Sequence, residues 1–83
     1  MATLMYPIAT EKAINMIEKS NIIEYIVDMR ATKPEIKAEF EKIFKVKVKS
    51  VATALTPRNT KKAYIKIASQ FKASDIALKL KLV

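Results

Sequence analysis

Lysines that alternate with apolar residues are the part of this sequence with the clearest chemical potential. Lys45, Lys47 and Lys49 are separated by single valines, and Lys62 and Lys66 stand at even spacing in a second run. Successive side chains of a β-strand point to opposite faces, so each run places ammonium groups on one face and apolar groups on the other. Such rows suit the phosphates of a polyanion. We therefore expect two cationic strands that bind nucleic acid.

A short polar turn joins the two basic runs. The segment Thr56–Thr60 contains a proline, which fixes φ, and Asn59, which tolerates positive φ. The flanking strands, Val46–Leu55 and Lys62–Ala68, are therefore predicted to form a β-hairpin with Arg58 at its tip. In the first arm the valines change face near Lys49 and Ser50, which indicates either a β-bulge or a strand covered on both sides.

Positive charge is unevenly distributed along the chain. The 83 residues include 16 Lys and Arg against 8 Asp and Glu, a net charge of +8. Residues 1–30 carry −1 and residues 31–83 carry +9. This asymmetry indicates a polyanionic partner, and it favours nucleic acid over an anionic membrane or an acidic protein.

Several residue types that enzymes and metal sites use are missing. The sequence has no Cys, His or Gly, so disulfides, thiolate or imidazole metal sites and glycine-rich phosphate loops are excluded. We expect no metal and no cofactor. No apolar run approaches the roughly 20 residues of a membrane span, and the start lacks the charged region of a signal peptide. The chain is therefore expected to stay in the cytoplasm.

Two helices and a strand are predicted before the hairpin. Thr10 is a candidate N-cap for a helix from Glu11 to about Lys19, and Ile22–Met29 is rich in β-branched residues, typical of a central strand covered on both faces. Thr32 is a candidate N-cap for the helix Pro34–Phe44, whose predicted inner stripe consists of Ile36, Phe40, Ile43 and Phe44.

The two ends of the chain complete the predicted order. Leu4–Ile8 contains a proline and is predicted to be an edge strand. Ser74 is a candidate N-cap for a last helix, with Ile76, Ala77 and Leu80 on its inner stripe. We expect residues 1–83 to form one small α+β domain. Its split β-α-β sheet, antiparallel or mixed, has the strand Lys62–Ala68 between the two strands of the crossover, and helices pack on it.

Several segments of the chain resemble one ribosomal protein family, the universal large-subunit ribosomal protein numbered twenty-three. The matching segments are Pro7–Ala13, Glu18–Asn21, Ala31–Lys37, Ile43–Val48, Val51–Thr53 and Lys61–Ile67. The short turn resembles the archaeal or eukaryotic form of the family. Asn59 stands where glycine is common, which suggests that a positive φ is kept there.

The resemblance implies a structural component of the large ribosomal subunit that binds ribosomal RNA near the exit of the nascent-chain tunnel, beside neighbouring ribosomal proteins. Lysine and arginine bind RNA phosphates, and an aromatic ring can stack on a base. The predicted RNA-binding residues are Lys12, Lys33, Lys37, Lys45, Lys47, Lys49, Arg58, Asn59, Lys61, Lys62, Tyr64 and Lys66.

The resemblance also implies a second surface. Ala9, Thr10 and Glu11 match the family region where the signal recognition particle and other nascent-chain factors dock. The simpler interpretation of Glu11, that it complements the dipole of the helix, is compatible with docking.

Two other classes stay open at this point. A free-standing RNA-binding module shares the split sheet, but it requires several stacking rings where the strand Lys61–Ile67 offers only Tyr64. A small anion-binding enzyme could use Arg58 or Arg30 as a clamp, but no convergent set of acids and bases accompanies them.

Overall fold

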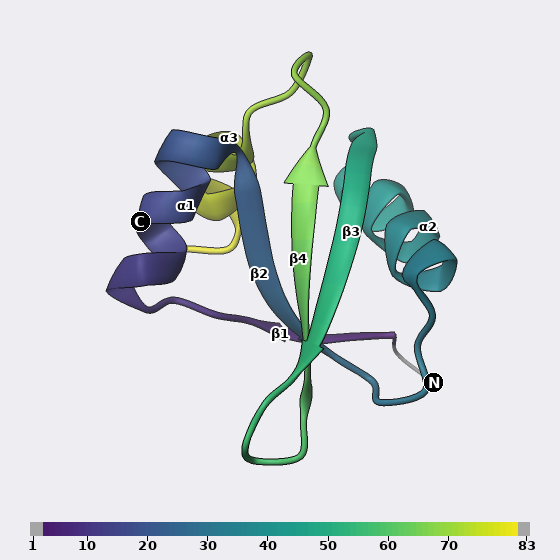
Figure 1. The fold of residues 1–83 in the computed structure, drawn as a ribbon. Coiled ribbons are helices and arrows are strands. Elements are labelled where there is room, and N and C mark those ends of the chain that lie inside the picture. The colour runs from purple at the N-terminus through teal and green to yellow at the C-terminus, as the bar shows by residue number, and fades with distance from the viewer. Residues whose placement is uncertain (1–2, 82–83) are drawn as a thin grey trace.

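The computed structural model describes residues 3–81, and its chain order is strand, helix, strand, helix, strand, strand, helix (Figure 1). The strands are β1 (Leu4–Pro7), β2 (Ile22–Val27), β3 (Val48–Leu55) and β4 (Lys61–Ile67). The helices are α1 (Glu11–Ser20), α2 (Lys33–Phe44) and α3 (Ala73–Lys79). The predicted α+β class is confirmed.

The sheet has the order β1-β2-β4-β3, and every neighbouring pair is antiparallel. The strand after the turn, β4, lies between the two strands that the α2 crossover connects, as predicted. The edge position of β1 is also confirmed. Because β4 separates β2 from β3, the described sheet needs no parallel pairing, and the antiparallel alternative holds.

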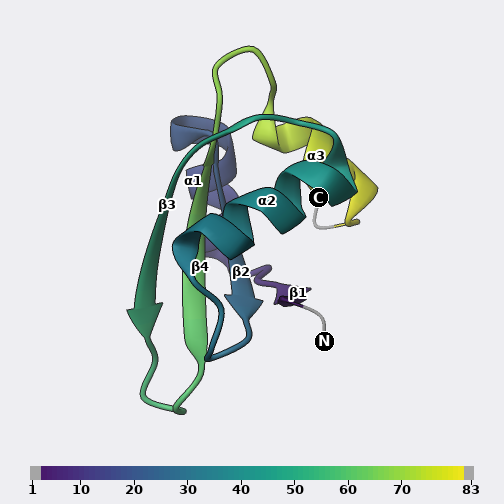
Figure 2. The same cartoon turned by 90° about the vertical axis from the view of Figure 1, so that its right-hand side faces the viewer.

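The three helices pack against the sheet and leave one of its faces open. In Figure 1 no helix lies in front of β2, β4 and β3, while Figure 2 shows α2 and α3 together on one side of these strands. The core between the layers includes Ile23, Ile65 and Ile67 from the sheet, and Ile36 and Phe40 from α2. Burying these apolar side chains is the main contribution to the stability of the fold.

The predicted start of α2 is confirmed in detail. The backbone N–H of Glu35 donates to Oγ1 of Thr32, and the Glu35 carboxylate accepts the N–H of Thr32 in return. This reciprocal capping box, with Pro34 in the first turn, fixes where the helix begins. The predicted stripe was wrong at Ile43, which is 52% exposed, because α2 turns this position away from the sheet.

Other boundaries differ from prediction by a few residues. β2 ends at Val27 instead of Met29, since the Asp28 carboxylate accepts the N–H of Arg30 and closes a turn. β3 begins at Val48 instead of Val46. The alternative of a bulge is confirmed, because the β3–β4 register shifts between Val48 and Ser50.

The N-cap predicted for α3 was wrong. The helix begins at Ala73, so Ser74 lies inside it, and Lys72 at the cap position makes no side-chain capping bond. The Ala73 N–H donates instead to Oδ1 of Asn21, which comes from the end of α1. A cap from a residue so distant in sequence leaves no local signal.

Candidate nucleic-acid interface

The open face of the sheet carries one part of the predicted interface. Ile65 of β4 is buried, so Lys62, Tyr64 and Lys66 point to the opposite, open face by strand alternation. Their partners on β3 are the small residues Ala54, Ala52 and Ser50, respectively. On this face the side chains of Lys62, Tyr64 and Lys66 therefore extend further from the sheet than the short side chains of β3.

Lys62 is already paired with an acid. Its Nζ lies 3.2 Å from Oε1 of Glu24, whose side chain is 4% exposed, and 5.6 Å from the centre of the Tyr64 ring. The hydrogen bond to Glu24 raises the pKa of Lys62, so this amine stays charged. Glu24 was not predicted from the sequence as part of the site, although a lone acid within an apolar strand is a signal for such a pair.

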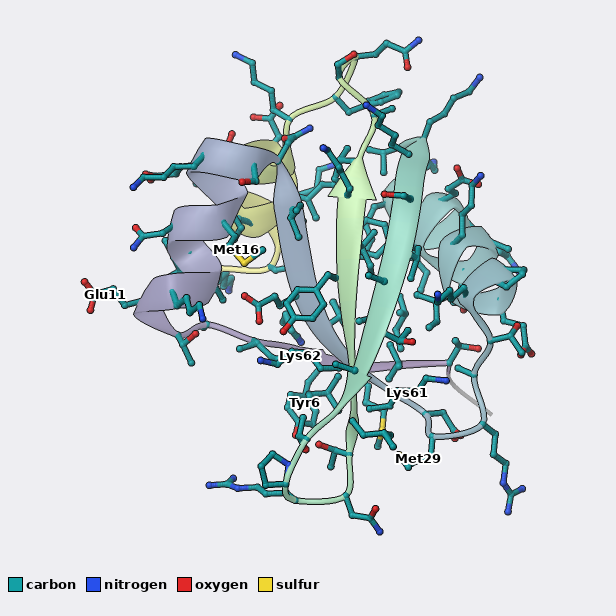
Figure 3. The ribbon with its side chains drawn as sticks, in the orientation of Figure 1. Tyr6, Glu11, Met16, Met29, Lys61 and Lys62 are labelled. Carbon is teal, nitrogen blue, oxygen red and sulfur yellow. The ribbon has the colours of Figure 1, made fainter. Side chains whose placement is uncertain are left out.

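Lys61 has a different role from its neighbour. It points to the helix side of the sheet, where its Nζ donates to the carbonyl oxygen of Ala31 at 2.7 Å. Figure 3 labels both lysines and shows them near the foot of the sheet. This bond connects the hairpin to the turn before α2, so Lys61 contributes to the stability of the fold.

Lysines from two elements meet in a groove beside the bulge. Lys33 and Lys37 on α2 and Lys49 on β3 line a groove of about 330 Å³, together with Pro34, Ser50 and Val51. All three lysines are exposed, and no carboxylate lines the groove. This convergence was not predicted, because it depends on how α2 packs beside the edge strand. We call the six residues the basic groove.

A hydrogen bond near the C-terminal end of α2 helps to position the two elements that form the basic groove. Oε2 of Glu41 accepts the N–H of Val48 at 2.9 Å, the first residue of β3. This bond, together with the packing of α2 on β3, fixes the start of the edge strand beside the helix.

The hairpin turn has the predicted conformation. Asn59 has φ 62°, and the Thr56 N–H donates to the Thr60 carbonyl oxygen at 2.9 Å. Arg58 lies exposed at the tip and lines a hollow of about 400 Å³ that also includes Lys62 and Tyr6. The positive φ supports the interpretation of Asn59 as a substitute for glycine.

Three predicted lysines lie away from these groups. Lys45 adopts a left-handed conformation after α2 and lines a hollow beside α3. Lys47 is exposed, and its carbonyl oxygen accepts the Ala68 N–H. Lys12 lies exposed on α1. In Figure 1 this helix lies toward the β2 edge of the sheet, whereas α2 lies toward the β3 edge.

The segment predicted to dock factors is exposed. Thr10 caps α1 by accepting the Ala13 N–H on Oγ1 at 3.2 Å. Ala9 and Glu11 are exposed, and Figure 3 shows Glu11 projecting outward from the start of the helix. The carboxylate is therefore available to a partner while it also complements the helix dipole.

Residues 3–81 contain no group of three or more His, Cys, Asp or Glu side chains that could hold a metal ion. No helix in that range has the length and apolar character needed to cross a membrane.

Comparison with known proteins agrees with the geometry. The family model of ribosomal protein L23 matches residues 2–80. The large ribosomal subunit protein uL23 of Methanothermobacter thermautotrophicus is 44% identical over 79 residues, which cover 95% of this chain and 92% of the relative. The chain therefore belongs to the ribosomal protein L23 family.

Proposed function

We propose that this chain binds large-subunit ribosomal RNA through the basic groove, the tip of the hairpin and the lysines of the open face. The family consists of ribosomal proteins and not of enzymes, and the archaeal relative is a large-subunit protein. The chain is accordingly a structural constituent of the large ribosomal subunit, and the interpretations as a free-standing module or an enzyme are set aside.

The basic groove is the observation that carries the RNA proposal. Its three exposed lysines come from two elements and face no carboxylate, so their charges are not neutralised within the described chain. Folded RNA presents irregular phosphate positions, and amines held at fixed places suit them. Lys66 and Arg58 extend the same charge along the hairpin, and Tyr64 offers a ring for stacking. The remaining candidates, Lys12, Lys45, Lys47, Lys61, Lys62 and Asn59, are proposed as further contacts.

A salt titration tests this proposal. Binding of the full chain to deproteinised large-subunit RNA is measured at several salt concentrations, with a variant that carries Lys33→Ala, Lys37→Ala and Lys49→Ala. Each lost phosphate contact removes about 0.7 to 0.9 from the slope of log K against log salt, so we expect a slope shallower by about 2.

The control for that experiment removes equal charge elsewhere. Lys19, Lys42 and Lys81 are exposed and lie outside the predicted set. Their triple alanine variant should keep a slope within about 1 of the parent value. Equal losses in the two variants would mean that binding follows net charge, and the assignment of the groove would be wrong.

We further propose that the chain lies near the exit of the nascent-chain tunnel, where Ala9, Thr10 and Glu11 form part of a docking site for the signal recognition particle. The resemblance of Pro7–Ala13 to the family motif and the outward carboxylate of Glu11 support this placement. A basic factor surface would bind the carboxylate, while Thr10 keeps the helix start in place.

Charge reversal at the helix start tests the docking proposal. Glu11→Lys should weaken binding of the signal recognition particle to ribosomes by about threefold to tenfold and leave subunit assembly intact. Glu18→Lys makes the same charge change at an exposed position of the same helix and serves as the control. Unchanged affinity for Glu11→Lys in a ribosome titration would contradict a docking role.

A further inference from the structure

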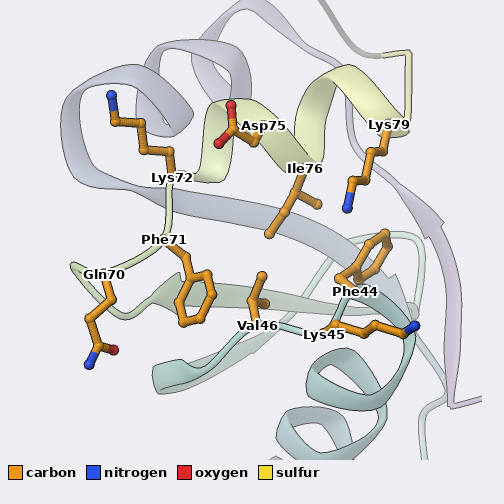
Figure 4. Close-up of a pocket in the computed structure, with 9 residues that line it drawn as sticks. All are labelled: Phe44, Lys45, Val46, Gln70, Phe71, Lys72, Asp75, Ile76 and Lys79. Atoms are coloured by element: carbon orange, nitrogen blue, oxygen red, sulfur yellow. The ribbon is translucent and has the colours of Figure 1, made fainter.

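A hollow between α2 and α3 is separate from the basic groove and from the open face. Figure 4 shows it among the end of α2, the segment before β3 and the start of α3. Its volume is about 490 Å³. Clefts that bind ligands typically measure about 300 to 1,000 Å³, so the space suffices for side chains from a partner.

The floor of the hollow is apolar. It consists of Phe44, Val46, Phe71 and Ile76, which come from separate segments of the chain. Ile76 belongs to the core, and the other three are partly buried and pack against it. In Figure 4 Val46 and Ile76 point toward one another, with Phe71 and Phe44 on either side. The partly buried Phe44, Val46 and Phe71 therefore cover the core at Ile76 and present apolar surface to the hollow.

The rim of the hollow is cationic. Lys45, Lys72 and Lys79 lie around it, with Asp75 as the one lining acid and Gln70 as a neutral neighbour. Figure 4 shows Lys79 directed into the hollow, while the Asp75 carboxylate and the ammonium groups of Lys72 and Lys45 point away from the floor. An occupant that complements this site combines apolar side chains with negative charge.

We propose that the hollow docks a short acidic, amphipathic segment of another protein. One or two apolar side chains of that segment rest on the floor, and its carboxylates pair with the lysines of the rim. The hollow uses none of the residues of the basic groove, and it shares only Lys45 with the residues proposed to contact RNA.

The floor favours a protein segment over a nucleotide. An inserted base needs hydrogen-bond partners for its polar edges, and burying them against Val46 and Ile76 without partners is unfavourable. The Phe44 ring already packs on Phe40, with 4.5 Å between the ring centres, so it is less available for stacking on a base. Aliphatic and aromatic side chains carry no such penalty.

Amide NMR spectra of the labelled full chain provide the test. The first probe is a synthetic peptide with Leu and Phe at helical spacing among Glu residues, and the second is the same peptide with Ser in place of Leu and Phe. The third probe is oligouridylate. We expect the first peptide alone to shift the amides of Val46, Phe71 and Ile76.

Matched variants then separate the rim from net charge. Lys79→Glu should weaken the peptide affinity by about threefold to tenfold. Arg30→Glu makes the same charge change in the exposed turn before α2 and should leave the affinity within about twofold. Amide dispersion reports whether each variant folds.

Three results would overturn the proposal. The first is the absence of shifts with the acidic amphipathic peptide. The second is equal binding of the serine peptide, which would show that charge alone acts. The third is displacement of the peptide by oligouridylate with shifts of the same amides, which would make the hollow an RNA site.

Discussion

Asn21 joins three elements through one side chain. Its Nδ2 donates to the carbonyl oxygens of Ile67 at 3.1 Å and Phe71 at 3.0 Å, and its Oδ1 accepts the Ala73 N–H. Its backbone is left-handed, with φ 57°, where it ends α1. One amide therefore holds the end of a helix, the end of β4 and the start of α3.

Removal of this amide should destabilise the whole chain. Asn21→Ala loses the three bonds and places in the left-handed region a residue that tolerates it less well than asparagine does, so we expect a loss of about 3 kcal/mol in the free energy of unfolding. Urea unfolding measures it. Asn21→Gly relieves the backbone part and should lose about 1 kcal/mol less.

Asn59 provides the comparison for that prediction. It is also left-handed, with φ 62°, but it is exposed in the turn. Asn59→Gly should change stability by no more than about 0.5 kcal/mol. An equally small effect at Asn21 would mean that its side-chain bonds contribute little.

The pair of Lys62 and Glu24 makes the free energy of unfolding decrease at alkaline pH. The hydrogen bond to Glu24 raises the pKa of Lys62 above its ordinary value of 10.5. The contribution of the pair is therefore complete below pH 10.5 and is lost as the pH rises through the folded pKa. At neutral pH the pair contributes in full.

Replacement of Lys62 tests this pair. Lys62→Met leaves the Glu24 carboxylate buried without its ammonium partner, and we expect a loss of about 1 to 2 kcal/mol at neutral pH. Urea unfolding at neutral pH and above pH 11 should show the difference from the parent chain shrinking as the pH rises. The exposed control Lys19→Met should show no such convergence.

At the scale of elements, α2 depends on its first turn. Hydrogen bonds from the backbone and then from the side chain of Thr32 lower the pKa of Glu35 below its ordinary value of 4.5. A lowered pKa means that the contribution of the carboxylate is present above pH 4.5 and is lost as the pH falls through the folded pKa. The start of the helix that supplies Lys33 and Lys37 therefore weakens in acid.

Two substitutions separate the parts of this cap. Thr32→Ala should lower stability by about 1 kcal/mol near neutral pH, since a free backbone N–H is left at the helix start. Glu35→Gln keeps an acceptor for Thr32 but cannot titrate, so its thermal midpoint should fall less between pH 6 and pH 3 than that of the parent chain. A parallel fall of the two midpoints would contradict the role of Glu35.

At the scale of the whole molecule, the topology was predictable from local signals. The caps at Thr10 and Thr32, the polar turn and the alternating strands indicated the order of elements, and the split β-α-β arrangement placed β4 between β2 and β3. Two boundaries were wrong where a side chain acted across space. The Asn21 cap of α3 and the Glu41 bond to β3 join residues whose proximity exists only in the folded chain.

The candidate site was predictable as a list of residues but not as a surface. Alternation correctly separated the two faces of β4, yet it could not show that Lys61 would bind Ala31, or that Lys62 would be paired with Glu24. The basic groove was also hidden, because Lys33 and Lys37 meet Lys49 only after α2 packs beside β3. Charge pattern identifies the type of partner, and packing selects the amines that remain free.

The register shift in β3 has a consequence for the chain before it joins a ribosome. β3 is an outer strand of the sheet, and its regular ladder is interrupted beside Lys49. The opposite outer strand, β1, ends at Pro7, which cannot donate a ladder hydrogen bond. Irregular backbone, lysine and proline at sheet margins all discourage strands of another copy from adding on. Newly made chains should therefore remain dispersed, and not stack through their sheets, while they wait for RNA.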